Sequence, residues 1–150
     1  MNHKTLSMIL FAVFLTGCNE KIFEKNILLN DVHSKLNATT VAELYYPEST
    51  DDVIKIIKHA KKNNQAISIS GGRHAMGGQQ FGEGTVHISM KKMNDVLAFD
   101  REKGIITIEA GIEWPQLINY LVTKQENTWP QWGIVQKQTG GDHLSVGGSM

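Results

Sequence analysis

The stretch SISGGRHAMGGQQF, from Ser68 to Phe81, decides the fold prediction. Ile67 and Ile69 alternate with small residues over 66–70, which is typical of a short β-strand. The glycines that follow carry no side chains to cover their backbone N–H groups, so these groups can line a concave site for an anion. The stretch is therefore either an anion cradle that follows a strand or a tight structural turn.

The glycine loop matches neither of the two common phosphate-binding motifs. It lacks the Lys-Ser/Thr ending of a P-loop, and the pairs Gly71-Gly72 and Gly77-Gly78 lack the G-x-G-x-x-G spacing. His74 stands between these pairs, either as a hydrogen-bonded loop residue or facing a ligand that the backbone holds. Two further glycine pairs, within 140–148, flank Ser145, and a ligand with two phosphates could lie between the early and late loops.

Hydrophobic periodicity predicts the other elements. A helix begins after Ser49, a good N-cap, and its apolar side consists of Val53, Ile56, Ile57 and Ala60. A strand over 85–89 and a hairpin over 96–110 follow. Trp114-Pro115 then opens a second helix, whose apolar side consists of Leu117, Ile118, Leu121 and Val122. This order indicates an α/β or α+β domain, and we adopt the α+β assignment.

The N-terminus has the outline of an export signal. Residues 1–7 carry Lys4 and no acid, 8–15 are apolar, and LTGC at 15–18 resembles the bacterial lipobox. We predict a lipoprotein signal peptide over 1–17, a lipid on Cys18, and a tether and entry segment over 18–40. Cys18 is the only cysteine, so it has no disulfide partner within the chain. The alternative is an ordinary secretory signal with an accidental cysteine.

Three motifs together resemble the flavin-binding domain of the vanillyl-alcohol oxidase and p-cresol methylhydroxylase (PCMH) family. They are SGGRHAMGGQQ at 70–80, IEAG at 108–111 and HLSVGG at 143–148. The resemblance implies an FAD-binding PCMH-type fold of two α/β subdomains, of which residues 41–150 form the N-terminal part. The likeness is greatest to bacterial FAD-binding oxidoreductases and plant cytokinin dehydrogenases.

The resemblance also implies which residues bind FAD. The first segment matches the pyrophosphate loop and a polar flavin contact at its end: Ser70, Gly71, Gly72, Arg73, His74, Ala75, Gly77, Gly78 and Gln79. The second segment matches the ADP and isoalloxazine region through Gly140, Ser145 and Gly148. His74 holds the position that in many members bonds covalently to the flavin. Arg73 departs from the glycine that commonly precedes this histidine.

The family's chemistry is hydride transfer from a small alcohol, amine or sugar-like substrate to FAD, and then to oxygen or another electron acceptor. No residue here stands out as a catalytic base. We expect the chain to be an incomplete FAD-binding domain in the bacterial cell envelope, anchored to a membrane by lipid. The alternative is a lipid-anchored remnant without catalysis.

Other classes of function are not favoured by the sequence. Zero formal net charge and the lack of a basic cluster argue against nucleic-acid binding. The histidines lack metal-ligand spacing, so we predict no metal site. Asp142, His143 and Ser145 suggest a hydrolase triad, but a G-x-S-x-G turn is missing.

Overall fold

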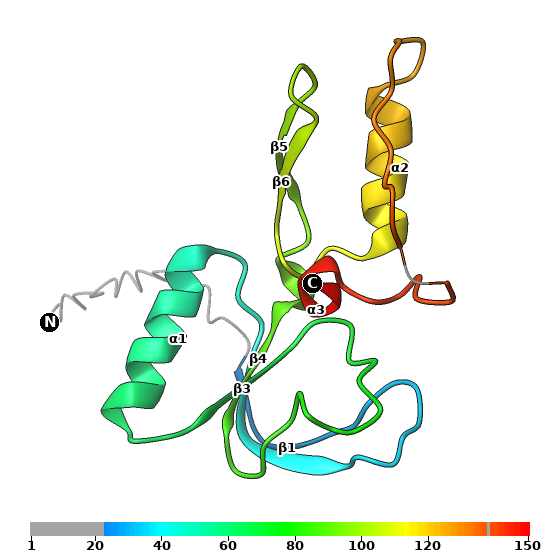
Figure 1. Cartoon of the computed structure of the whole chain (residues 1–150). Helices are drawn as coiled ribbons and strands as arrows, with labels where there is room; N and C mark the ends of the chain where they lie inside the picture. Colours follow the sequence, from blue (N-terminus) through cyan, green and yellow to red (C-terminus); the bar gives the residue numbers. More distant parts are fainter. Residues whose placement is uncertain (1–22, 138) are drawn as a thin grey trace, which may run out of the picture.

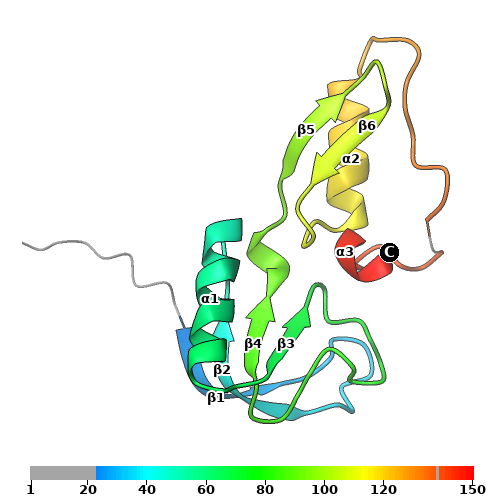
Figure 2. The same cartoon turned by 60° about the vertical axis from the view of Figure 1, so that its left-hand side comes forward.

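The computed structural model describes residues 23–137 and 139–150, and the predicted signal peptide and Cys18 lie outside them. One part of the fold is a four-stranded sheet with helix α1 against it, and the other is a hairpin with helix α2 beside it (Figures 1 and 2). The short helix α3 (Val146–Ser149) lies where the two parts meet. The α+β prediction is confirmed.

The sheet has the strand order β1-β2-β4-β3. Its strands are β1 (Phe23–Leu29), β2 (Thr39–Tyr45), β3 (Ile67–Ser70) and β4 (Val86–Ser89). β1 pairs antiparallel with β2, whereas β4 pairs parallel with both β2 and β3. β4 therefore lies in the middle, and all four of its residues are buried.

Helix α1 (Thr50–Lys62) begins as predicted, because the Ser49 side chain accepts a hydrogen bond from the N–H of Asp52. Ile56 and Ala60 are buried against Val86 and Ile88 of the sheet. The predicted apolar side is wrong at one position. Ile57 is 45% exposed, so the buried stripe is narrower than the run of apolar residues.

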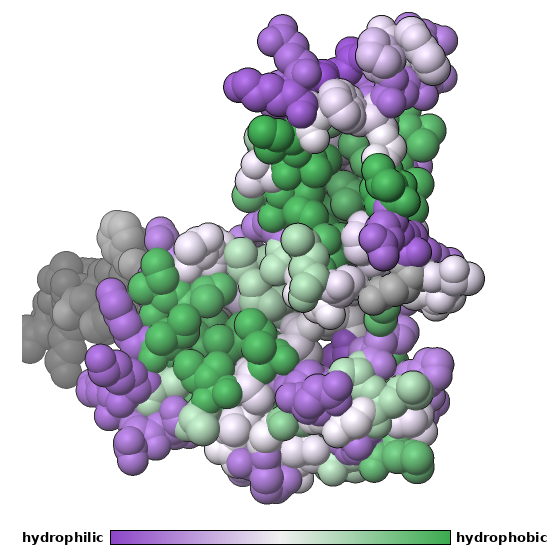
Figure 3. Space-filling view, viewed as in Figure 1, coloured by the Kyte–Doolittle hydropathy of each residue, from purple (hydrophilic) through white to green (hydrophobic). Residues whose placement is uncertain are grey.

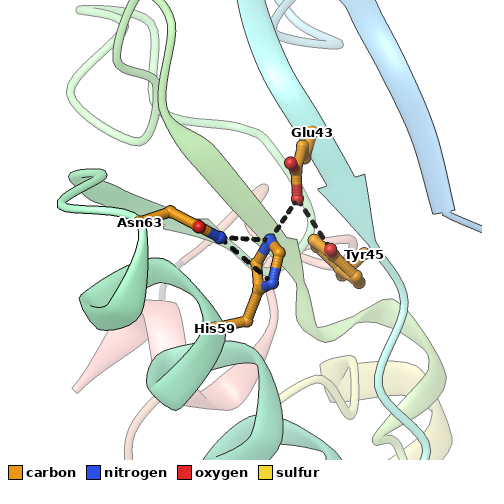
Figure 4. Close-up of polar contacts among 4 residues, drawn as sticks. All are labelled: Glu43, Tyr45, His59 and Asn63. Carbon is orange, nitrogen blue, oxygen red and sulfur yellow. Dashed lines mark hydrogen bonds and ion pairs between the residues drawn. The ribbon is translucent and has the colours of Figure 1, made fainter.

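One further contact ties α1 to the sheet (Figure 4). The Glu43 carboxylate of β2 lies 2.9 Å from Nε2 of His59 and accepts a 2.7 Å hydrogen bond from the Tyr45 hydroxyl. The Asn63 amide lies 3.3 Å from the same imidazole. This cluster fixes the C-terminal end of α1 on the strand.

Part of the predicted tether and entry segment over 18–40 is a β-strand. β1 lies within it and is hydrogen-bonded to β2 over six residue pairs, and Leu29 at its end is buried. Asp31 is also buried, and it accepts hydrogen bonds from the backbone of His33 and the amide of Asn37. Residues 23–40 are therefore part of the folded domain.

The second part begins after a short 3-10 helix, η1 (Met90–Lys92), and contains β5 (Val96–Asp100), β6 (Ile105–Ile108) and α2 (Trp114–Lys124). The core of this part consists of Ile112, Leu117, Leu121 and Val146. Ile118 is 38% exposed and Val122 is 66% exposed, so these two members of the predicted apolar side are not core residues.

Hydrophobic side chains gather over α1 and again between the hairpin and α2 on the face shown in Figure 3. Exposed apolar residues of these elements include Ile54, Ile57, Leu97, Ile105 and Val122. Within residues 23–137 and 139–150, no helix is both long enough and apolar enough to cross a membrane.

Candidate functional site

The glycine loop after β3 borders two adjoining cavities of about 350 and 270 Å³. Residues 70–74 line both of them. The first cavity extends to Tyr46, Glu113 and His143, and the second extends to Gln79, Gln80 and the segment 144–148. The site therefore lies at the junction of the two parts of the fold.

The glycines of the loop are needed because the late segment comes very close to them. A Cβ atom on Gly71 would lie 1.9 Å from the Ser145 hydroxyl oxygen, and one on Gly72 would lie 2.4 Å from the carbonyl oxygen of His143. No side chain fits in either space. The early and late glycine segments are therefore in direct contact, and together they line the second cavity.

The third motif, IEAG at 108–111, holds the late glycine segment next to the glycine loop. Gly111 packs so closely on η1 that a Cβ atom would lie 1.9 Å from the carbonyl oxygen of Met90. The N–H of Gly147 donates to the carbonyl of Ala110 at 3.0 Å, and that of Val146 donates to Ile112 at 2.8 Å. All three motifs therefore converge, although they are far apart in the sequence.

The loop offers a run of unbonded donors. Within the described part of the chain, the backbone N–H groups of residues 71–75 donate to no acceptor. The run contains Arg73 at a φ of 59°, a left-handed conformation that occurs in anion-binding nests. A left-handed φ costs a non-glycine residue about 1 kcal/mol. This cost explains why a glycine would suit the position that Arg73 occupies here.

An orphaned acceptor also borders the second cavity. The Gln80 side chain donates from Nε2 to the carbonyl of Ala75 at 3.0 Å, which fixes the orientation of its amide. Its Oε1 is buried and has no partner among the described residues. A ligand that supplies an N–H or O–H group would satisfy this atom.

His74 lies in the wall shared by the two cavities and is paired with a second histidine. Its ring and that of His143 are stacked, with centroids 6.3 Å apart and planes 15° apart. Nδ1 of His143 lies 3.2 Å from the carboxylate of Glu113, the residue before α2. The geometry therefore presents an imidazole to the space that the unbonded N–H groups border.

His87 of β4 lies beneath the glycine loop and is fully buried. Burial, and to a smaller extent the positive charge of Arg73, lower its pKa from 6.5 to about 4. The ring is consequently neutral at pH 7. Both of its nitrogens are within 2.8 Å of serine hydroxyls, those of Ser68 and Ser70.

Nine of the twelve predicted cofactor-binding residues line the second cavity: Ser70, Gly71, Gly72, Arg73, His74, Ala75, Gln79, Ser145 and Gly148. Gly77, Gly78 and Gly140 are not among its lining residues, and their contact with the cofactor stays a prediction. Gly78 has a φ of 70° and packs against Asn37, whereas Gly140 lies at an open turn with a φ of 76°. All three lie in or next to turns.

The sequence did not predict that Asn37 and Asp31 hold the glycine loop in place. The Asn37 amide donates to the carbonyl of Met76 at 2.6 Å and to buried Asp31 at 2.9 Å. Burial opposes ionisation of Asp31, but the hydrogen bonds from Asn37 and Ser34 outweigh it and lower the pKa of this carboxyl.

The roles of Gln80, His87 and Glu113 in the site were also not predicted from the sequence. The histidine between Val86 and Ile88 in a predicted strand was the one available signal.

Comparison with known proteins identifies the family. The family model described as "FAD binding domain" matches residues 41–149. The chain therefore belongs to the FAD binding domain family, and the predicted family, fold and cofactor are confirmed.

Two relatives and one solved structure illustrate the likeness. An uncharacterized oxidoreductase, ORF5 in the fasciation locus of Rhodococcoides fascians, is 29% identical over 119 residues, which is 79% of this chain and 25% of that protein. L-gulonolactone oxidase of Mus musculus is 38% identical over 71 residues, 47% of this chain and 16% of that enzyme. A BBE-like 1 protein of Physcomitrella patens shares the fold, with a TM-score of 0.60 and 15% identity over 81% of this chain and 24% of that one. The chain thus spans a quarter or less of these proteins.

The donors and acceptors of the site fit FAD. The unbonded N–H groups of residues 71–75 suit its two phosphates, and the orphaned Gln80 oxygen suits one of its hydroxyl or N–H groups. When bound, FAD supplies the hydride acceptor, and the protein holds and orients it.

Proposed function

We propose that this chain is the FAD-binding part of an exported oxidoreductase that removes hydride from a small alcohol, amine or sugar-like substrate. The run of unbonded N–H groups over 71–75, beside the glycine-lined contact with the late segment, is the observation that carries this proposal. Among the substrate classes, a sugar-like compound is favoured by the likeness to L-gulonolactone oxidase. Oxygen or another acceptor then reoxidises the cofactor.

The proposed roles follow the geometry. The N–H groups of residues 71–75 bind the two phosphates, and Gln79, Ser145 and Gly148 border the rest of the cofactor in the second cavity. The imidazole of His74 forms a covalent bond to the flavin 8α-methyl carbon. This bond would replace a C–H bond of the methyl group and the N–H bond of the imidazole; both protons would leave, and two electrons would enter the ring system and pass to the acceptor. A linked cofactor cannot be lost outside the cytoplasm.

The proposed location is the bacterial cell envelope, with the chain attached to a membrane through lipid on Cys18. The sequence LTGC at 15–18 and the lack of a second cysteine support this proposal. Mass spectrometry of the N-terminal peptide from isolated membranes should find a chain that begins at a lipid-modified Cys18. An unmodified Cys18 in the mature protein would contradict it.

FAD supplied to the purified chain should give a yellow protein that survives gel filtration. Gly72→Ala places a methyl group against the His143 backbone and should separate the two glycine segments. We expect the dissociation constant of the non-covalent FAD complex, which forms before attachment to His74, to rise about tenfold, corresponding to about 1.4 kcal/mol. Gly133→Ala is the matched control, because a Cβ atom there meets nothing within 4 Å. No FAD binding, or equal effects of the two variants, would contradict the proposed site.

A further inference from the structure

A chain of short hydrogen bonds runs beneath the glycine loop. The Ser70 hydroxyl lies 2.8 Å from Nε2 of His87, and Nδ1 of His87 lies 2.8 Å from the Ser68 hydroxyl. The Ser68 hydroxyl lies 2.6 Å from that of Thr85, which lies 2.7 Å from the carbonyl oxygen of Gly82. The parallel pairing of β3 with β4, with Ser68 opposite His87, brings these side chains together.

The direction of each hydrogen bond follows from the number of hydrogens available. The Gly82 carbonyl can only accept, so Thr85 donates its one hydroxyl hydrogen to it. Ser68 must then donate to Thr85, which leaves Ser68 to accept from Nδ1–H of His87. A neutral imidazole carries only one N–H, so its Nε2 accepts, and Ser70 donates to it.

This direction decides what Ser70 offers to a ligand. Ser70 lines both cavities, but its only hydroxyl hydrogen is directed to His87. Its oxygen can therefore accept a hydrogen bond from a ligand and cannot donate one. Gln80 presents a second acceptor to the second cavity, whereas the backbone of residues 71–75 presents donors.

We propose that His87 is a positioning residue that holds Ser70 as a hydrogen-bond acceptor in the FAD site. A hydroxyl or N–H group of FAD lies beside Ser70, because a phosphate oxygen there would meet lone pairs with no hydrogen between them. The phosphates are thereby confined to the N–H groups of residues 71–75. This inference rests on the FAD site proposed above, and it assigns to that site a residue that acts through Ser70.

The first experiment reads the tautomer of His87 in the native chain. Long-range ¹⁵N–¹H correlation spectra of the ¹⁵N-labelled full chain at pH 7 should show the hydrogen on Nδ1 and none on Nε2, with the signals assigned by their loss in His87→Gln. A hydrogen on Nε2, or on both nitrogens, would overturn the inference. The reading needs neither bound FAD nor activity.

The second experiment alters the chain at a distance from the cavity. Ser68→Ala removes the acceptor of Nδ1–H, so the ring should change to the Nε2–H tautomer and turn the Ser70 hydrogen toward the ligand. We expect the dissociation constant for FAD to rise about threefold to tenfold. Ser68→Thr retains the hydroxyl and should preserve both the native tautomer and the native affinity.

The outcomes separate this inference from the proposed function. A native chain that binds no FAD would overturn both. Normal FAD binding together with an Nε2–H tautomer in the native chain would overturn the role of His87 alone. An unchanged affinity and tautomer in Ser68→Ala would also overturn it.

Discussion

His74→Ala is expected to remove all covalently bound flavin from the protein. The native protein, denatured in acid and separated from free cofactor, should retain flavin fluorescence, and the variant should retain none. The reason is geometric, because His74 presents an imidazole at the wall shared by the two cavities, next to the N–H groups that bind the phosphates in our proposal.

His143→Ala is the matched control for this experiment. His143 stacks on His74 and borders the first cavity only, so its loss should leave the covalent bond in place. Flavin that can be extracted completely from the native protein would contradict the covalent assignment. Flavin fluorescence that persists in His74→Ala but disappears in His143→Ala would assign the covalent bond to His143.

Acidification from pH 7 to pH 4 is expected to destabilise the native chain by roughly 3 kcal/mol through His87 alone. Its pKa falls from 6.5 to about 4 in the folded state because of burial and, to a smaller extent, the charge of Arg73. Below pH 6.5 the unfolded chain therefore binds a proton that the folded chain does not bind until about pH 4. The stabilisation is fully present above pH 6.5 and is lost at about 1.4 kcal/mol per pH unit below it.

Denaturant unfolding at pH 7, 6, 5 and 4 measures this effect as the difference in pH dependence between the native chain and His87→Gln. The variant can be less stable at every pH, so only the slopes are compared. His33→Gln, at an exposed histidine, should follow the native profile. Parallel profiles for the native chain and His87→Gln would contradict a neutral, buried His87.

Local signals in the sequence were sufficient for much of the fold. The Ser49 cap, the hairpin turn after Asp100 and Trp114-Pro115 each act within a few residues, and each element begins or turns where predicted. β1 was missed because five of its seven residues are exposed, so it shows no buried alternation. β1 is stabilised by its pairing with β2, and a local sequence pattern does not predict such a pairing.

The sequence predicted which residues form the site, but not how they are arranged in space. The resemblance identified the glycine loop, and in the structure residues 70–75 line one cavity with Ser145. Gly140 lines neither cavity, and its φ of 76° places it at a left-handed turn, which favours glycine whether or not a ligand is in contact. The His87 chain depends on the register of β3 against β4, so it could be seen only in three dimensions.

The central claim is that the unbonded N–H groups of residues 71–75 bind the phosphates of FAD. Amide ¹⁵N–¹H spectra of the full chain, recorded during titration with FAD, test this claim most directly. We predict that the amide signals of residues 71–75 shift the most, and that ADP, which carries the same two phosphates, shifts the same signals. FAD binding that leaves these five amides unchanged would contradict the claim.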